Sequence, residues 1–266
     1  DETSKEIYLS ADINLKGLSN SEIIEFLKQH AINLSLDAIC RVYPIHVPIA
    51  CVDGDKVSVE KLLTDYSFKY NVSGKAQFIQ NEGGQFIART EVEKMSKSKY
   101  NVVNPDDVIE QYGADCFRMY EMFLGPIEVS KPWDTKGIEG VSRFLRKLWN
   151  LFYDAQDIFC VDNTAPSDAE WKVLHKTIKK IEEDIQRLSF NTAVAQFMIA
   201  VNELGSLKCN KRAILEPLII LLNPFAPFIT EELWKNLGNT GSIVDAAFPL
   251  LEEKYLVENS FSYPVA

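Results

Sequence analysis

The chain has 266 residues and a formal net charge of −10, and 46% of its residues are hydrophobic. This is enough for two domains with a buried core, and no apolar run reaches the roughly 18 residues that would indicate a membrane-spanning helix. The five cysteines are scattered without a Cys-x-x-Cys pair, which argues for reduced thiols in a cytoplasmic protein and against a zinc site built from this chain alone. The acidic charge restricts contact with RNA to a local basic surface.

Residues 1–93 are expected to form a small mixed α/β region. A capping box at Ser19–Glu22, followed by an apolar run, predicts a first helix. Residues 45–52 have the composition of a strand, and the proline among them predicts an edge strand or a bulge. Residues 57–66 are expected to form a short helix, and residues 77–88, with two glycines at their centre, a β-hairpin.

A run rich in lysine and serine follows the predicted hairpin. It has no apolar period of 2 or 3.6 residues, so it is expected to be an exposed loop. Ammonium groups and small hydroxyl donors suit a polyphosphate, although a solvated loop without a ligand is the plainer interpretation of such a run. The candidate phosphate-contacting residues are Lys94, Met95, Ser96, Lys97 and Ser98.

Two helices with clear boundaries come next. Asn104 can cap the first, Pro105 suits its first position, and the two aspartates that follow favour the positive end of the helix dipole. This helix should end at Gly113, a natural residue for the left-handed position after a helix. The second helix should start at Ala114 and end before Gly125.

The rest of the chain is expected to be an antiparallel helical bundle. Apolar residues recur at helical spacing from 141 to 152, and a linker is predicted at 161–166. A second capping box, at Ser167–Glu170, opens the next helix. The remaining helices should begin after Asn191, near Lys211 with a kink at Pro217, and after Thr230.

These elements predict an α+β fold that is predominantly α, in which a small mixed α/β region with a β-hairpin precedes an antiparallel helical bundle. Three domains are expected. Residues 1–93 would form the mixed region, residues 94–160 the loop with the helices after it, and residues 161–266 the bundle.

The loop and the residues after it resemble the class I aminoacyl-tRNA synthetases. Lys94–Ser98 is similar to their KMSKS signature, and Tyr112–Asp115 with Arg118 is similar to its usual continuation. The finer resemblance is to the leucyl-tRNA synthetases of bacterial type, and it extends over roughly residues 77–249. It rests on several further segments: Ser98–Asn101, Met122–Phe123 with Pro126, Trp133, Gly140–Trp149, His175–Ile178, Phe190–Ala193, Leu222–Phe228 and Glu231–Trp234.

The resemblance implies a ligase that activates leucine with ATP and transfers it to leucine tRNA, with Mg²⁺ expected in the full enzyme. Lys97 would stabilise the charge that develops on pyrophosphate, Lys94 would assist, and the other loop residues would shape the loop. It also implies a cytoplasmic monomer. The family's other signature, His-x-Gly-His, does not occur in this sequence. The chain is therefore expected to be a C-terminal-side fragment that is inactive and binds no ATP or metal on its own.

Two basic sets are candidates for contact with tRNA, because the resemblance implies that the bundle is a tRNA-binding domain of the anticodon-binding type. A solvated polar face, partly neutralised by nearby acidic residues, is the alternative for each lysine. Arg143 and Lys147 are favoured, because they match positions where the leucyl family contacts tRNA and project from one side of a helix. His175 lies beside the second set and is expected on its polar face. The candidates are Arg143, Arg146, Lys147, Lys172, Lys176 and Lys179.

Two alternatives stay open. The segment Leu222–Trp234 is shared with the isoleucyl and valyl enzymes, so the chain could come from another class I ligase. It could also be a helical RNA-binding module without catalysis of its own. The sequence upstream would discriminate between these alternatives, because a ligase should carry the His-x-Gly-His signature and an editing insertion there.

Overall fold

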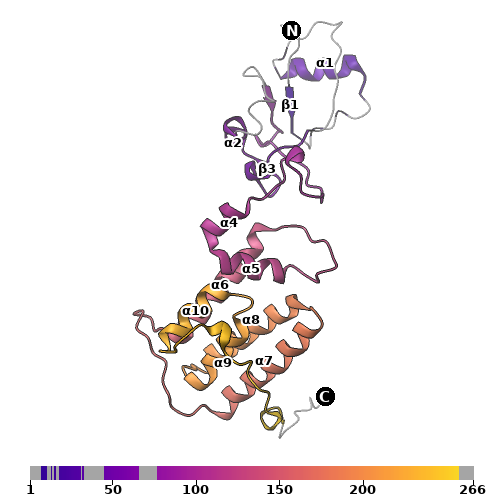
Figure 1. The fold of residues 1–266 in the computed structure, drawn as a ribbon. Helices are drawn as coiled ribbons and strands as arrows, with labels where there is room; N and C mark the ends of the chain where they lie inside the picture. The colour runs from indigo at the N-terminus through magenta and orange to yellow at the C-terminus, as the bar shows by residue number, and fades with distance from the viewer. Residues whose placement is uncertain are drawn as a thin grey trace, which may run out of the picture. The chain divides into compact units, whose positions relative to one another are not determined.

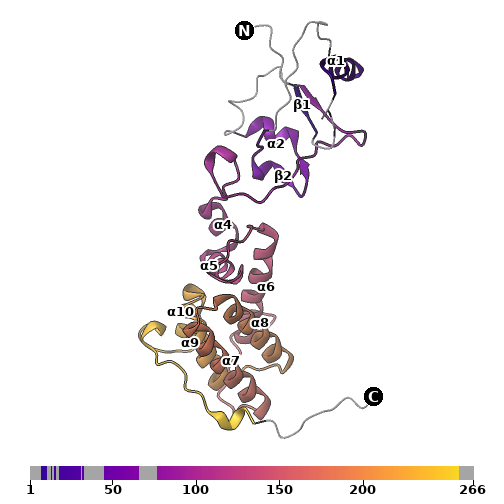
Figure 2. The ribbon, with the colours of Figure 1, turned by 90° about the vertical axis from the view of Figure 1, so that its right-hand side faces the viewer.

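The structure is a computed structural model that describes residues 7–10, 13, 15, 18–30, 32, 45–65 and 77–257. The chain divides into two compact units, of which the first ends at Val103 and the second begins at Asn104. The named strands lie in the first unit, and the second is built from helices and loops (Figures 1 and 2). A predominantly α fold with a small mixed region is thereby confirmed.

The first unit contains a two-stranded parallel sheet. Strand β1 (Ile7–Leu9) pairs with β4 (Gln77–Ile79), so that Tyr8 lies opposite Phe78. Successive side chains point to opposite faces of a strand, and both faces of this sheet are covered. On one face Ile79 packs with helix α1 (Asn20–Gln29), and on the other the Tyr8 and Phe78 rings stack at 5.1 Å in a second apolar cluster. The predicted capping box of α1 is present.

The hairpin of this unit lies elsewhere than predicted. Strands β2 (Val52–Asp53) and β3 (Lys56–Val57) pair in antiparallel fashion around Gly54, whose φ of +66° suits glycine. Residues 77–88 form no hairpin ladder, because β4 pairs with β1 and the turn after it is closed by the Asn81 side chain, whose Oδ1 accepts from the Gly83 and Gln85 amides. The predicted strand at 45–52 is also wrong, since helix η1 (Ile49–Cys51) occupies most of its second half.

The short helix predicted at 57–66 is α2 (Val59–Thr64), which Ser58 caps; residue 66 lies outside the described residues. Leu62 of α2 is buried with Cys51, Val57 and Phe86. The first residue of η1 also contacts a later loop of this unit, because the Ile49 amide donates to the Tyr100 carbonyl at 3.0 Å.

The second unit begins with the two predicted helices. Helix α4 (Pro105–Tyr112) is capped by Asn104, whose Oδ1 accepts from the Asp106 amide, and it ends at Gly113 with a φ of +89°. Helix α5 (Ala114–Phe123) follows directly. Both predictions are confirmed, because each boundary is set by chemistry within a few residues.

Helices α6 to α10 form the bundle (Figure 1). Large side chains on several of them are fully buried, among them Phe152, Phe197 and Phe225, and the last two meet edge to face at 5.3 Å. In the described part of the chain no helix is long and apolar enough to cross a membrane. The bounds are α6 Thr135–Phe152, α7 Asp168–Gln186, α8 Phe190–Ser206, α9 Arg212–Leu222, α10 Pro227–Asn236, η3 Ile243–Asp245 and η4 Glu253–Tyr255.

The start of α10 differs from the prediction. Thr230 is buried inside the helix, which already begins at Pro227. Its first turn is capped by a residue far away in the sequence: the Asp115 carboxylate of α5 accepts from the Phe228 amide at 3.1 Å and from the Ile229 amide at 2.7 Å. A buried carboxylate at the positive end of a helix is favourable, so Asp115 links α5 to the bundle.

The expectation that His175 lies on a polar face is wrong. Its side chain is only 2% exposed and is stacked against the Tyr255 ring at 4.6 Å, while its Nδ1 accepts from the Glu252 amide. Burial lowers the pKa of His175 below its ordinary value, and the nearby Glu252 carboxylate opposes this effect. His175 therefore belongs to the contact between α7 and η4.

Candidate functional site: the lysine loop and a basic groove

We call residues 93–101 the lysine loop. Ser96 is extended, with φ −153° and ψ 139°, and a single 3-10 turn, η2 (Lys97–Lys99), follows it. Tyr100 then adopts the left-handed conformation with φ 53°. The loop lies wholly in the first unit and is exposed over most of its length, as a loop without an apolar period should be.

The three lysines of the loop differ in their surroundings. Lys99 forms an ion pair with Glu93, and the hydrogen bond from Lys99 holds the pKa of the Glu93 carboxyl below its usual range. Lys94 and Lys97 are exposed, and within the described residues their ammonium groups have no ion-pair partner. Two cationic groups therefore face solvent, while the third is occupied by a carboxylate of the same loop.

The other predicted loop residues line the same turn. The Ser96 and Ser98 hydroxyls lie 2.8 Å apart and hydrogen-bond to each other, and Met95 is 44% exposed. Asn101, which was not singled out as a site residue, joins the ends of the loop: its Oδ1 accepts from the Ser96 amide at 2.8 Å, and its Nδ2 donates to the Lys94 carbonyl at 3.4 Å. In the sequence, this closure was indicated by the close spacing of Ser96, Ser98 and Asn101, because short polar side chains often hydrogen-bond to the nearby backbone.

The first basic set lies on α6, and each of its residues has a partner. Arg143 is 3.6 Å from Glu139, and Arg146 reaches the Ser142 hydroxyl at 3.5 Å. Lys147 donates to the Asn202 Oδ1 of α8 at 2.7 Å. All three side chains remain exposed, and an exposed ion pair of this kind is weak enough to rearrange around a phosphate.

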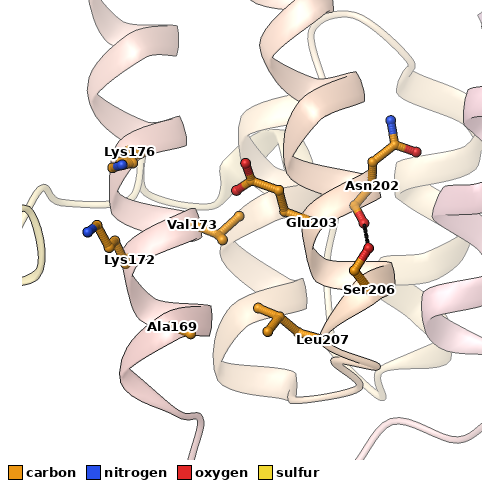
Figure 3. A pocket seen from close by; sticks show the side chains of 8 residues that line it. All are labelled: Ala169, Lys172, Val173, Lys176, Asn202, Glu203, Ser206 and Leu207. Atoms are coloured by element: carbon orange, nitrogen blue, oxygen red, sulfur yellow. Dashed lines mark hydrogen bonds between the residues drawn. The ribbon is translucent and has the colours of Figure 1, made fainter. Parts of the chain in front are cut away.

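The second basic set borders an open groove of about 460 Å³ between α7 and α8, which we call the α7–α8 groove. Lys172 and Lys176 stand on the α7 side, and Val173 and Leu207 supply apolar surface, as Figure 3 shows. Lys179 is exposed one turn further along α7, and its neighbour Lys180 is bound to Asp184 at 2.6 Å.

Helix α8 lies between the two basic sets. Asn202 accepts the ammonium group of Lys147 from α6, and it also lines the α7–α8 groove beside Lys172 and Lys176. Glu203 is the acidic residue of this groove, and Figure 3 shows its carboxylate between α7 and α8. Asn202 and Glu203 of α8 thus lie between the basic residues of α6 and those of α7.

Two family models match the chain. The model described as "tRNA synthetases class I (I, L, M and V)" matches residues 70–129, which contain the lysine loop, α4 and α5. The model described as "Anticodon-binding domain of tRNA ligase" matches residues 171–265, which contain most of α7 and the helices after it.

Curated relatives match the chain over most of its length. A leucine–tRNA ligase of Cytophaga hutchinsonii is 54% identical over 226 residues, which are 84% of this chain and 24% of that protein. The same enzyme of Flavobacterium psychrophilum is 54% identical over 229 residues, which are 84% of this chain and 23% of that protein. The chain thus spans about a quarter of the length of these relatives.

A solved structure is also similar. It is the ternary complex of Agrobacterium radiobacter K84 agnB2 LeuRS with tRNA and LeuAMS, and it is 29% identical with a TM-score of 0.53. The match covers 62% of this chain and 23% of that one. An identity above a quarter together with this fold similarity supports common ancestry and not only a shared helical architecture.

Proposed function

Because the chain belongs to the leucine–tRNA ligase family and spans about a quarter of the length of its curated relatives, we propose that it is the part of such an enzyme that holds ATP through the lysine loop and tRNA through the bundle. The observation that supports this most strongly is an identity of more than half over 84% of the chain. The three predicted segments, 1–93, 94–160 and 161–266, would then be a remnant of the catalytic domain with its insertion, the loop with a stem-contact region, and the tRNA-binding bundle.

In the proposed reaction a carboxylate oxygen of leucine attacks the α-phosphate of ATP, and the bond to the β-phosphate breaks. Leucyl adenylate forms and pyrophosphate leaves with the negative charge. Lys97 is exposed at the start of the loop's turn and pairs with no carboxylate of the described residues. Its ammonium group would stabilise this charge, with Lys94 assisting. Leucine would then pass from the adenylate to the terminal ribose of leucine tRNA.

Mg²⁺ is expected to accompany ATP in the full enzyme. Within the residues that the structure describes, no group of three acidic, histidine or cysteine side chains is placed to hold a metal.

Neutralising Arg143 and Lys147 is expected to weaken tRNA binding without changing leucine activation. The reason is that cationic side chains on an exposed helix contact phosphates, and each contact releases counterions. Each loss should reduce the slope of log affinity against log salt by about 0.7 to 0.9. The measurement is titration of leucine tRNA onto the full-length Arg143→Gln/Lys147→Gln double variant at several salt concentrations, since glutamine preserves the helix.

A matched control is Lys235→Gln on α10, which removes an exposed lysine outside both basic sets. It should leave the salt slope unchanged. An unaltered affinity and slope in the double variant would indicate that Arg143 and Lys147 lie on a solvated helix face and do not contact tRNA. Lys172, Lys176 and Lys179 would then remain as candidates for tRNA contact.

The alternatives differ in what happens to bound tRNA. A ligase esterifies leucine to the tRNA, an isoleucyl or valyl enzyme transfers a different amino acid, and a helical RNA-binding module binds tRNA without product. Labelled leucine appearing in acid-precipitable tRNA with the full-length protein supports the ligase. Tight tRNA binding without any charged product would favour the binding module. A monomer in the cytoplasm is part of the same proposal.

A further inference from the structure

The side chain of Asn101 closes the lysine loop. Its two polar atoms bind two backbone groups of that loop: Oδ1 accepts from the Ser96 amide at 2.8 Å, and Nδ2 donates to the Lys94 carbonyl at 3.4 Å. One planar amide therefore ties residues five and seven positions upstream to the end of the loop. A side chain that uses both its donor and its acceptor on the backbone fixes a local conformation.

The backbone between these two hydrogen bonds includes a residue in an unfavourable conformation. Ser96 is extended, the 3-10 turn carries Lys97, and Tyr100 is left-handed with φ 53°. Residues with a large side chain rarely adopt the left-handed conformation, because it brings Cβ close to the following carbonyl. The surroundings must therefore hold it. The Tyr100 carbonyl accepts from the Ile49 amide at 3.0 Å, and the next residue, Asn101, accepts from the Ser96 amide through its side chain.

The groups around Lys97 are already engaged with one another. Ser96 and Ser98 hydrogen-bond through their hydroxyls, and Lys99 is paired with Glu93. Lys97 itself is exposed at the first position of the turn. The backbone of the turn, whose entry at Ser96 is held by Asn101, therefore sets the position from which the Lys97 side chain extends.

We infer that Asn101 is a positioning residue for Lys97: its amide preforms the turn, so that the backbone that carries Lys97 need not be ordered when charge develops on the departing pyrophosphate. This inference rests on the proposed function. Holding a charged group in place before the reaction reduces the entropy lost on reaching the transition state. Asn101 itself does not touch the substrate.

The structural half of this inference is tested by hydrogen exchange of the Ser96 amide in the full-length protein. Asn101→Ala removes the acceptor and should speed this exchange about tenfold or more, whereas Asn101→Asp keeps an acceptor oxygen and should preserve most of the protection. If Ser96 exchanges at the same rate in the wild type and in Asn101→Ala, the closure does not exist in solution and the inference fails.

The functional half is tested by a double-mutant cycle on single-turnover adenylate formation. Asn101→Ala should slow the reaction about tenfold while the KM for ATP changes less than about threefold, because the contact matters in the transition state. In a Lys97→Ala background the same change should have almost no effect, because there is no longer a lysine to position. Equal slowing in both backgrounds would overturn the role through Lys97 and would indicate a general structural effect.

The two tests separate this inference from the proposed function. If the unaltered full-length protein does not activate leucine, the proposed function and the role of Asn101 in it are both rejected, and hydrogen exchange still decides whether Asn101 closes the loop. If leucine is activated and only the cycle fails, the proposed function stands and the positioning role falls.

Discussion

Replacing Lys97 with alanine in the full-length enzyme should slow leucyl adenylate formation about a hundredfold, which corresponds to about 3 kcal/mol of lost charge stabilisation. Leucine binding should change far less, because this contact strengthens as charge develops on the leaving pyrophosphate. The structure supports the choice of Lys97, since it is exposed on the turn and no carboxylate of the described residues pairs with it. The measurement is single-turnover adenylation at saturating leucine and ATP.

Lys99→Ala is the matched control within the same loop. Lys99 is two residues away but is paired with Glu93, and an exposed pair of this kind contributes roughly 0 to 1 kcal/mol. Its loss should slow adenylation less than about fivefold. A change of less than about threefold in Lys97→Ala would contradict the role given to Lys97, and an equal loss in both variants would indicate that the loop acts only through its total charge.

Asp115→Ala should destabilise the second unit by about 2 kcal/mol, because it removes both acceptors from the first turn of α10. Asp115 is 7% exposed, so water cannot easily replace it. The 266-residue chain offers a convenient probe, because its four tryptophans, at 133, 149, 171 and 234, all lie in the second unit. Urea unfolding followed by tryptophan fluorescence should therefore report on this unit and show a lower midpoint with an unchanged m-value.

Asp168→Ala is the control for this prediction. Asp168 is also an aspartate in the first turn of a helix, α7, but it is exposed and belongs to the helix it stabilises. Its removal should cost only a few tenths of a kcal/mol. If Asp115→Ala were as mild as Asp168→Ala, the contact between α5 and α10 would not contribute to the stability of the bundle.

Helix boundaries could be predicted from the sequence wherever their chemistry is local. Ser19–Glu22 and Ser167–Glu170 form the predicted capping boxes, and Asn104 and Gly113 delimit α4. In each case the interacting groups are within a few residues of each other, so their spacing alone carries the information. The lysine loop was recognisable for a similar reason, because its charges and hydroxyls are consecutive.

Contacts between distant segments could not be predicted in this way. The start of α10 was misplaced at Thr230, because its cap is Asp115, 113 residues before the Phe228 amide. His175 was expected on a polar face, but the segment at Glu252–Tyr255 returns to cover it. The strand pairing of the first unit also depends on a distant partner, since β4 pairs with β1 and not with the residues that follow it.

On the basic helices, some features could be predicted from local spacing and others depend on contacts between distant segments. The positions of Lys172, Lys176 and Lys179 on one side of α7 followed from their spacing. The contact of Lys147 with Asn202 joins residues 55 positions apart, and the acidic Glu203 enters the α7–α8 groove from another helix. A periodic pattern identifies the face of a helix, but it does not identify the neighbouring helix that shares the surface.

The central claim is tested most directly by ATP–pyrophosphate exchange with the full-length protein in the presence of leucine, isoleucine or valine, measured in parallel. The proposed function predicts rapid exchange with leucine, exchange lower by at least about tenfold with the other two, and loss of the leucine signal in Lys97→Ala. Exchange driven by isoleucine or valine in preference to leucine would assign the chain to another class I ligase. No amino-acid-dependent exchange by a folded, tRNA-binding protein would contradict the ligase itself.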